Sequence, residues 1–187
     1  MQPTFFDPGT YDGVRYEHLT QDIVNIAMSR PAVRNAQNME MTYALNTAFD
    51  RAAQDDEVKV IILSGEGDHF SAGHDMGGDG NRTWRDFHTV GTWAAFDGPG
   101  VEGLYGREKE IYLEMCERWR NLAKPTIAVV QGSCVAGGLM LAWCCDMIVA
   151  ADDARFRDPT LEFGVAGVEF FMHPWELGGR KAQEWLM

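Results

Sequence analysis

Residues 127–138 read IAVVQGSCVAGG, and this stretch decides the fold class. Its β-branched apolar run, 127–130, is typical of a strand that is buried on both faces of a sheet. The run passes through a turn of small residues into the uncharged segment 137–145, which we expect to form a short buried helix. An earlier stretch has the same pattern of an apolar run followed by a loop with small residues. There the apolar run 61–64 is followed by the loop 70–75, which reads FSAGHD.

Each of these junctions places small residues directly after a buried strand. The first N–H groups of a helix have no partner inside the helix, and they carry partial positive charge. Two such junctions side by side can therefore direct two N–H donors at one carbonyl oxygen, which is an oxyanion hole. Glycine is needed there because a side chain would hold a substrate away. One glycine turn is weak evidence, since such turns are common, whereas the pair is more specific.

The rest of the chain alternates predicted strands with predicted helices. We expect strands over residues 14–19, 23–28, 58–63, 126–130 and 146–150. Asn35 or Asn38 caps a first helix, and later helices cover 108–122, 137–145 and 176–187. The inward faces follow helical spacing, with Met41, Leu45, Ala48, Phe49 and Ala52 in the first helix and Ile111, Met115, Trp119 and Leu122 in the second. No single element is predicted for 81–106. The alternation predicts a layered α/β fold in a single domain, 1–187.

The composition is that of a globular chain. Of 187 residues, 45% are hydrophobic and 24% are charged, which excludes a disordered chain. Lys and Arg number 16 and Asp and Glu 28, so the net charge of -12 argues against nucleic acid or an anionic membrane as partner. The uncharged stretch 125–145 is long enough to span a bilayer, but its glycine turns favour a buried strand, a turn and a buried helix.

The four cysteines, at 116, 134, 144 and 145, form no Cys-x-x-Cys motif, and we interpret them as small apolar fillers. No His, Cys and carboxylate residues have metal-ligand spacing. Residues 1–13 lack the pattern of a secretory signal, so a reducing, cytoplasmic location is expected.

Five motifs, taken in order, resemble the crotonase (enoyl-CoA hydratase/isomerase) family. They are Arg30-Pro31 with Asn35-Ala36, the loop 70–75, the run 124–132, Ala136-Gly137-Gly138 and Cys145-Asp146. The resemblance runs from about residue 14 to the last residue, and it is highly specific as a set. It implies a spiral of ββα repeats, with the usual C-terminal helical part missing, and a homotrimer or hexamer. It also implies acyl-CoA substrates and an oxyanion hole made by the main-chain N–H groups of His74 and Gly137.

The chain departs from the family at two positions. Typical hydratases of the family carry catalytic glutamates at the positions that are Met140 and Thr160 here. Water addition needs one group that activates water and one that protonates the α-carbon. A thioether supplies neither, and a threonine hydroxyl is a poor substitute at neutral pH.

Other acidic residues lie close by in the sequence. Glu169 lies near the position where dienoyl-CoA isomerases and aryl-CoA dehalogenases of the family carry an acidic residue, so we favour it for proton transfer or nucleophilic attack. Asp158 and Glu162 are further candidates, and Glu162 shares the face of Thr160 if the strand there continues. Glu169 is equally well explained as a structural carboxylate. The side chains of His173 and His74 titrate near neutrality and could assist, although His173 is better explained by packing or capping.

Coenzyme A is expected as part of the substrate, with no permanently bound cofactor. Its phosphates need a local basic rim, for which Arg30, Arg34 and Arg82 are candidates, although they could equally be surface residues. Ala36, Ala72, Asp75 and Met76, in the loops around the predicted oxyanion hole, complete the predicted CoA site. The aromatic residues within 84–96 either line an acyl pocket or only cover the core.

These observations favour an acyl-CoA enzyme, a lyase or isomerase of the enoyl-CoA hydratase/isomerase type with altered acid/base residues. A CoA-ester-binding protein without activity and a structural subunit of the same fold are the alternatives, motivated by Met140 and Thr160. The chain ends inside its last predicted helix, so we expect exposed apolar surface there.

Overall fold

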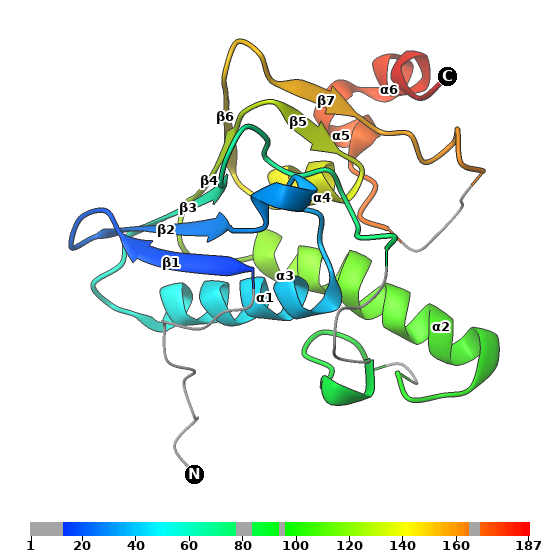
Figure 1. The fold of residues 1–187 in the computed structure, drawn as a ribbon, viewed down its shortest axis with the longest axis horizontal. Helices are drawn as coiled ribbons and strands as arrows, with labels where there is room; N and C mark the ends of the chain where they lie inside the picture. The colour runs from blue at the N-terminus through cyan, green and yellow to red at the C-terminus, as the bar shows by residue number, and fades with distance from the viewer. Residues whose placement is uncertain (1–12, 78–83, 94–95, 165–168) are drawn as a thin grey trace.

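The computed structural model describes residues 13–77, 84–93, 96–164 and 169–187. A five-stranded sheet forms its centre, in the order β1-β2-β3-β4-β6 (Figure 1). These strands are β1 (Val14–His18), β2 (Ile23–Met28), β3 (Val60–Gly65), β4 (Thr126–Val130) and β6 (Met147–Ala150). β1 is antiparallel to β2, and the other neighbours are parallel. A second sheet pairs β5 (Ser133–Val135) with β7 (Arg155–Arg157). The predicted α/β class is confirmed.

The first helix, α1 (Met39–Gln54), packs against β1 and β2 and contacts the helix α3 (Met115–Arg120) (Figure 1). All five residues predicted for its inward face are buried, because they recur along one side of the helix. Between α1 and β2 lies a short 3-10 turn, η1 (Pro31–Val33). Asn38 caps α1, since its side chain accepts a hydrogen bond of 3.0 Å from the Met41 N–H.

We expect Asn38→Ala to lower the free energy of unfolding by about 1 kcal/mol, because the Met41 N–H then loses its partner at the helix start. Urea unfolding measures this change. Asn38→Asp retains an accepting oxygen at the cap and should stay near the wild-type value. Equal losses in both variants would contradict the capping role.

The helix predicted over 108–122 begins earlier than expected. It is continuous from α2 (Gly100–Glu108) through a π-helical segment, η3 (Lys109–Glu114), into α3. Glycine is a weak helix former, so Gly103 and Gly106 hide this start in the sequence. The packing explains one of them, because a Cβ on Gly103 would lie 1.6 Å from the Gly98 carbonyl oxygen. Upstream, a 3-10 turn, η2 (Trp84–Asp86), lies within 81–106.

The stretch 125–145 forms β4 and the short helix α4 (Gly137–Trp143), as predicted, but the turn predicted between them contains the strand β5. Within the described residues, no helix has the length and apolar character needed to cross a membrane. Near the chain end, the single helix predicted for 176–187 is wrong. Two helices, α5 (His173–Leu177) and α6 (Gly179–Leu186), meet at Gly178, whose φ of +75° interrupts the helical path.

Exposed apolar side chains occur around α5, near the chain end, where they were expected, and they also occur on β6. Met147 and Val149 are 50% and 58% exposed, and Phe163 and Trp175 are each 76% exposed. The four cysteines are buried, in agreement with their predicted role as fillers. Among the described residues, no group of His, Cys, Asp and Glu is placed to hold a metal ion.

Candidate active site at the meeting point of two loops

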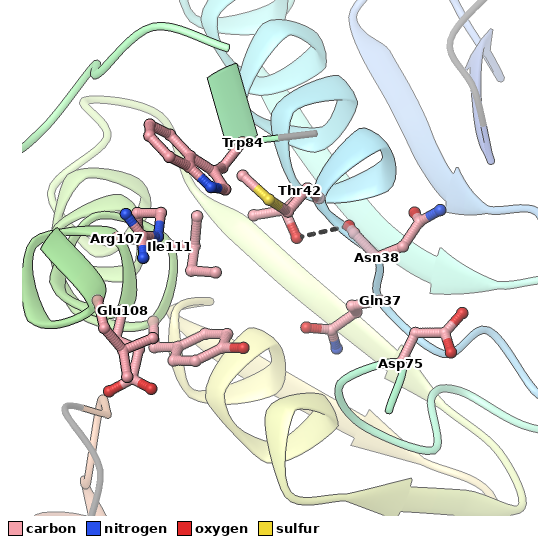
Figure 2. A pocket seen from close by; sticks show the side chains of 11 residues that line it. Gln37, Asn38, Thr42, Asp75, Trp84, Arg107, Glu108 and Ile111 are labelled. Atoms are coloured by element: carbon pink, nitrogen blue, oxygen red, sulfur yellow. Dashed lines mark hydrogen bonds between the residues drawn. The ribbon is translucent and has the colours of Figure 1, made fainter. Parts of the chain in front are cut away.

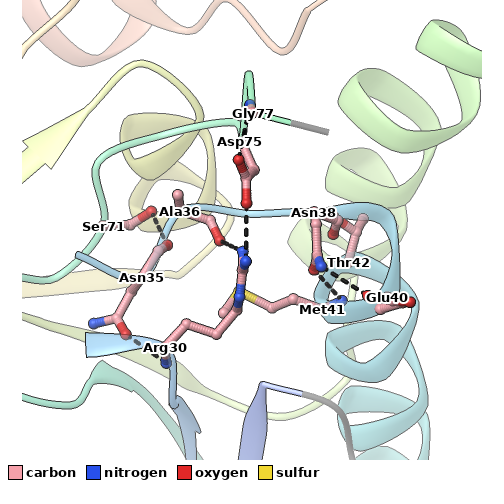
Figure 3. Close-up of polar contacts among 10 residues, drawn as sticks. All are labelled: Arg30, Asn35, Ala36, Asn38, Glu40, Met41, Thr42, Ser71, Asp75 and Gly77. Atoms are coloured by element: carbon pink, nitrogen blue, oxygen red, sulfur yellow. Dashed lines mark hydrogen bonds and ion pairs between the residues drawn. The ribbon is translucent and has the colours of Figure 1, made fainter. Parts of the chain in front are cut away.

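The loop 66–70 is held in place by the side chain of Asn35. Its amide group donates to the carbonyl oxygens of Glu66 (2.9 Å), His69 (2.8 Å) and Phe70 (3.2 Å). Its own oxygen accepts from the Arg30 N–H at 2.9 Å. Asn35 is fully buried and has φ of +54°, a left-handed conformation that asparagine tolerates better than most residues. It therefore joins the two segments that flank the site (Figure 3).

Ser71 fixes the backbone that leads to His74. Its buried hydroxyl donates to the Asn35 carbonyl oxygen at 2.8 Å. The same oxygen accepts from the Gln37 side-chain amide at 3.0 Å and from the Gly73 N–H at 3.2 Å. Because these contacts join the loop to the segment 35–37 and also fix its own backbone, the positions of Gly73 and His74 are strongly constrained.

The second loop, between β5 and α4, pairs directly with the first. The Ser71 N–H donates to the Ser133 carbonyl oxygen, and the Val135 N–H donates to the Ser71 carbonyl oxygen, both at 3.0 Å. Gly73 has φ of +97°, and a Cβ on it would lie 2.9 Å from the Val135 carbonyl oxygen and 3.3 Å from the Gly137 nitrogen. Only glycine permits this approach, so the two predicted glycine turns meet.

The main-chain N–H groups of His74 and Gly137 lie on either side of this contact. Gln37 pairs with His74 through hydrogen bonds from the Gln37 N–H to Gly73 and from the Asp75 N–H to Gln37. In such a pairing the N–H of His74 itself is directed away from Gln37. Gly137 is the first residue of α4, where the N–H has no partner in the helix. Neither N–H donates a hydrogen bond to another described residue.

A pocket of about 180 Å³ lies beside these loops, in the region shown in Figure 2. Trp84 and Ile111 form its apolar side, and Gln37, Asp75 and Glu108 contribute polar groups. The remaining lining residues are Asn38, Met39, Thr42, Leu104, Arg107 and Tyr112. The aromatic stretch 84–96 thus contributes at least Trp84 to a pocket. The sequence did not point to Gln37, Glu108 or Tyr112, because which face of the predicted helix 108–122 lines a pocket depends on how distant segments pack together.

The side chain of His74 packs between this pocket and α4. Its ring centroid lies 4.0 Å from that of Tyr112, and its Cε1 and Nε2 would lie 2.7 and 2.8 Å from a Cβ on Gly137. Burial lowers the pKa of His74 to about 4, so the imidazole is neutral at neutral pH. Its Nε2 is shielded from solvent and has no hydrogen-bond partner among the described residues.

Arg30 and Asp75, both predicted for the CoA site, form an ion pair of 2.9 Å (Figure 3). The Arg30 guanidinium also donates to the Ala36 carbonyl oxygen. The Gly77 N–H, together with Arg30, holds the pKa of Asp75 below its usual value. Arg30 therefore ties the segment at Ala36 to the loop of His74. The other predicted CoA contacts differ in their positions. Ala72 lies in this loop between Ser71 and Gly73, and Arg34 and Met76 are exposed. Arg82 lies outside the described residues.

The three candidate carboxylates occupy different environments. Glu162 is exposed and forms an ion pair of 2.6 Å with Arg157. The strand ends at Arg157, so the condition under which Glu162 would share a strand face with Thr160 is not met. Glu169 is half-buried, and its pKa is raised to about 7 by burial and by the negative charges of Asp158 and Glu108. Glu108 lines the pocket, and its negative charge affects the pKa of Glu169. Glu169 therefore lies close to the pocket.

Asp158 is buried beside a second cavity, of about 440 Å³, which Thr160 and His173 also line. Its carboxylate accepts from the Thr160 N–H at 2.9 Å and also from the Thr160 hydroxyl. Its other oxygen lies 2.9 Å from His173 Nε2. Burial lowers the pKa of His173, and Asp158 opposes that shift.

Met140 lies one helical turn after Gly137 and is buried. Its sulfur accepts a hydrogen bond of 3.4 Å from the Phe170 N–H, and Phe170 is also buried. Since Glu169 directly precedes Phe170, this contact holds the Glu169 backbone beside α4. The structure thus places His74 at Gly137, and the residue after Glu169 at Met140, one turn further along α4. Asp158 lies close enough to Glu169 to raise its pKa, whereas Glu162 is exposed and paired with Arg157.

The model of the enoyl-CoA hydratase/isomerase family matches residues 18–97 and 100–187 of the chain. A solved structure described as a probable enoyl-CoA hydratase from Mycobacterium smegmatis is 44% identical, with a TM-score of 0.77 over 93% of this chain and 63% of that one. EchA13 of Mycobacterium tuberculosis, whose name ascribes enoyl-CoA hydratase activity to it, is 43% identical over 96% of this chain. A 4-chlorobenzoyl coenzyme A dehalogenase of Arthrobacter sp is 29% identical over 93%.

The chain therefore belongs to the enoyl-CoA hydratase/isomerase family, and its fold is the crotonase fold. It spans 58% of the length of each of these two curated relatives.

Proposed function

We propose that the protein is an acyl-CoA thioester enzyme that stabilises a thioester enolate, as a lyase or isomerase of the hydratase/isomerase type. The observation that carries this proposal is the pair of main-chain N–H groups at His74 and Gly137, which have no partner among the described residues and flank the close contact at Gly73. Two fixed donors aimed at one oxygen stabilise the charge that develops there in the transition state.

The acid/base chemistry is proposed to depend on Glu169, because Met140 and Thr160 stand where the family's hydratases carry glutamates. A carboxyl with a pKa of about 7 exchanges a proton readily near neutral pH. Support comes from Phe170, the residue after Glu169, which contacts Met140 one helical turn along α4 from Gly137. Asp158 acts indirectly in this proposal, since its negative charge helps to raise the pKa of Glu169.

Coenzyme A enters as part of the substrate. The exposed Arg34 and Met76, together with Ala36, Ala72 and Arg82, are proposed to meet the nucleotide and pantetheine, whereas the ion-paired Arg30 and Asp75 shape the loop beneath. The apolar exposed strand β6 supports association into trimers or hexamers, which would cover Met147 and Val149.

The proposal is tested by measuring hydration of crotonyl-CoA and longer enoyl-CoAs and, in parallel, calorimetric binding of the same thioesters. We expect turnover in the wild type and a loss of about 100-fold in kcat for Gly73→Ala. The added Cβ would meet the Val135 carbonyl oxygen, and the φ of +97° would be strained, so the two N–H groups would move apart.

Gly179→Ala is a matched control, because nothing lies within 4 Å of a Cβ at that position. Thermal unfolding of both variants separates misfolding from a displaced oxyanion hole. Tight thioester binding without turnover of any enoyl-CoA would instead establish the second candidate, an inactive CoA-ester-binding protein, which Met140 and Thr160 favour. Failure to bind any thioester would leave only a structural role.

A further inference from the structure

The side chain of His74 has an environment that an oxyanion hole does not explain, because that role needs only its backbone. Its Nε2 is buried without a hydrogen-bond partner among the described residues. A buried polar atom without a partner destabilises the folded state. Groups of this kind in native proteins call for a functional explanation. The ring also packs directly on Gly137, whose N–H is the second proposed oxyanion donor.

We propose that the His74 imidazole takes and returns the proton at the α-carbon of the bound acyl-CoA, while Glu169 handles the proton at the β-carbon. This inference rests on the proposed function, and it assigns the two proton-transfer roles to two residues of different chemistry.

The positions of the two residues along α4 support this division. The α-carbon of a thioester is bonded to the carbonyl carbon, so it lies next to the oxygen that the two N–H groups hold. His74 Nε2 lies at Gly137, beside one of these donors. Glu169 adjoins Phe170, which contacts Met140, three residues further along α4.

The protonation states also suit these roles. Burial lowers the pKa of His74 to about 4, close to the ordinary value of a glutamate at about 4.3, so the ring has the basicity of the missing carboxylate without its negative charge. A neutral base does not repel the enolate that it creates. Tyr112 from η3 packs against the ring, and burial is the cause of its lowered pKa.

The balanced step is clearest in the elimination direction. His74 Nε2 accepts the α-proton of a 3-hydroxyacyl-CoA, and the electrons of the broken C–H bond move to the thioester oxygen as an enolate. They return to form the α,β double bond while the bond from the β-carbon to the hydroxyl oxygen breaks. Protonated Glu169 gives its proton to that oxygen, and water leaves. Hydration follows the same path in reverse.

The test is the exchange of the α-protons of butyryl-CoA in D₂O, followed by NMR, because this reaction needs the α-carbon base and the oxyanion hole but no β-carbon chemistry. We expect His74→Gln and His74→Phe to slow exchange about 100-fold while binding butyryl-CoA as tightly as the wild type. Both variants keep the main-chain N–H, and His74→Phe keeps a ring beside Tyr112. Glu169→Gln should exchange at the wild-type rate. His88→Gln, at an exposed loop histidine, is the matched control.

The pH dependence supplies a second readout. Exchange by a base with a pKa of about 4 should be constant from about pH 5 to pH 8, whereas exchange by Glu169 would rise through about pH 7. Wild-type exchange rates in both His74 variants, a rise through pH 7, or a wild type that binds butyryl-CoA without exchanging it would each overturn the inference. A wild type that binds no butyryl-CoA would instead overturn the proposed function beneath it.

Discussion

Glu169→Gln is expected to lower the rate of enoyl-CoA hydration by about 100-fold or more, because the amide can neither take a proton from water nor give one back. The variant should bind the thioester as well as the wild type, since the proposed oxyanion donors are main-chain groups at His74 and Gly137. Steady-state kinetics with crotonyl-CoA measure the loss as a change in kcat with little change in KM. Glu162→Gln is the matched control, because Glu162 is exposed and pairs only with Arg157 among the described residues.

The pH dependence of hydration gives an independent check. If one proton is shared between His74 and Glu169, with pKa values of about 4 and about 7, activity should be greatest between these values. It should fall about tenfold per pH unit above pH 7, where the shared proton is lost. Glu169→Gln should remove this alkaline limb. An unchanged profile in that variant would exclude Glu169 from proton transfer.

Measurements of folding stability separate the loss of proton transfer in Glu169→Gln from damage to its fold. The pKa of Glu169 is raised from 4.5 to about 7, so the folded protein holds this proton more tightly than the unfolded chain does. The resulting stabilisation is complete below pH 4.5 and is lost as the pH rises through about 7. At pH 8 the wild type buries an ionised carboxylate at this position, whereas Glu169→Gln has an uncharged amide there. The free energy of unfolding of the variant should therefore exceed that of the wild type at pH 8. A less stable variant at pH 8 would mean that its activity loss reflects a damaged fold.

The sequence was most informative where periodicity and turn chemistry agree. Apolar runs predicted β2, β3 and β4 to within two residues, and the inward face of α1 followed from its helical spacing. The meeting of the loops at Gly73 and Gly137 was also anticipated, because glycines after buried strands permit close backbone contact. These features depend on local chemistry, which a single sequence retains.

Other features depend on contacts between distant segments, and the sequence could not supply them. The pairing of β5 with β7 joins residues about 20 positions apart without a strong strand pattern in either. Glu108 and Tyr112 lie within the helix predicted over 108–122, but their place at the pocket depends on how that helix packs against distant segments. The lowered pKa of His74 and the raised pKa of Glu169 arise from burial, which only the packed structure defines.

Asn35→Ala should cause the largest loss of stability, about 3–5 kcal/mol. Its side chain satisfies three carbonyl groups, of Glu66, His69 and Phe70, and each buried group left without a partner costs about 1–3 kcal/mol. Alanine is also less tolerant of the φ of +54° at this position. Urea unfolding monitored by tryptophan fluorescence measures the change.

Two variants separate the hydrogen bonds from the backbone conformation. Arg34→Ala places alanine at a neighbouring residue with φ of +53° whose side chain is exposed, so it carries the conformational cost alone and should lose no more than about 1–2 kcal/mol. Asn35→Gly removes the hydrogen bonds, but glycine adopts the φ of +54° without strain. Its loss of stability should therefore fall between those of Asn35→Ala and Arg34→Ala. Equal losses in Asn35→Ala and Arg34→Ala would mean that backbone conformation, and not the three hydrogen bonds, holds the loop of the proposed oxyanion hole.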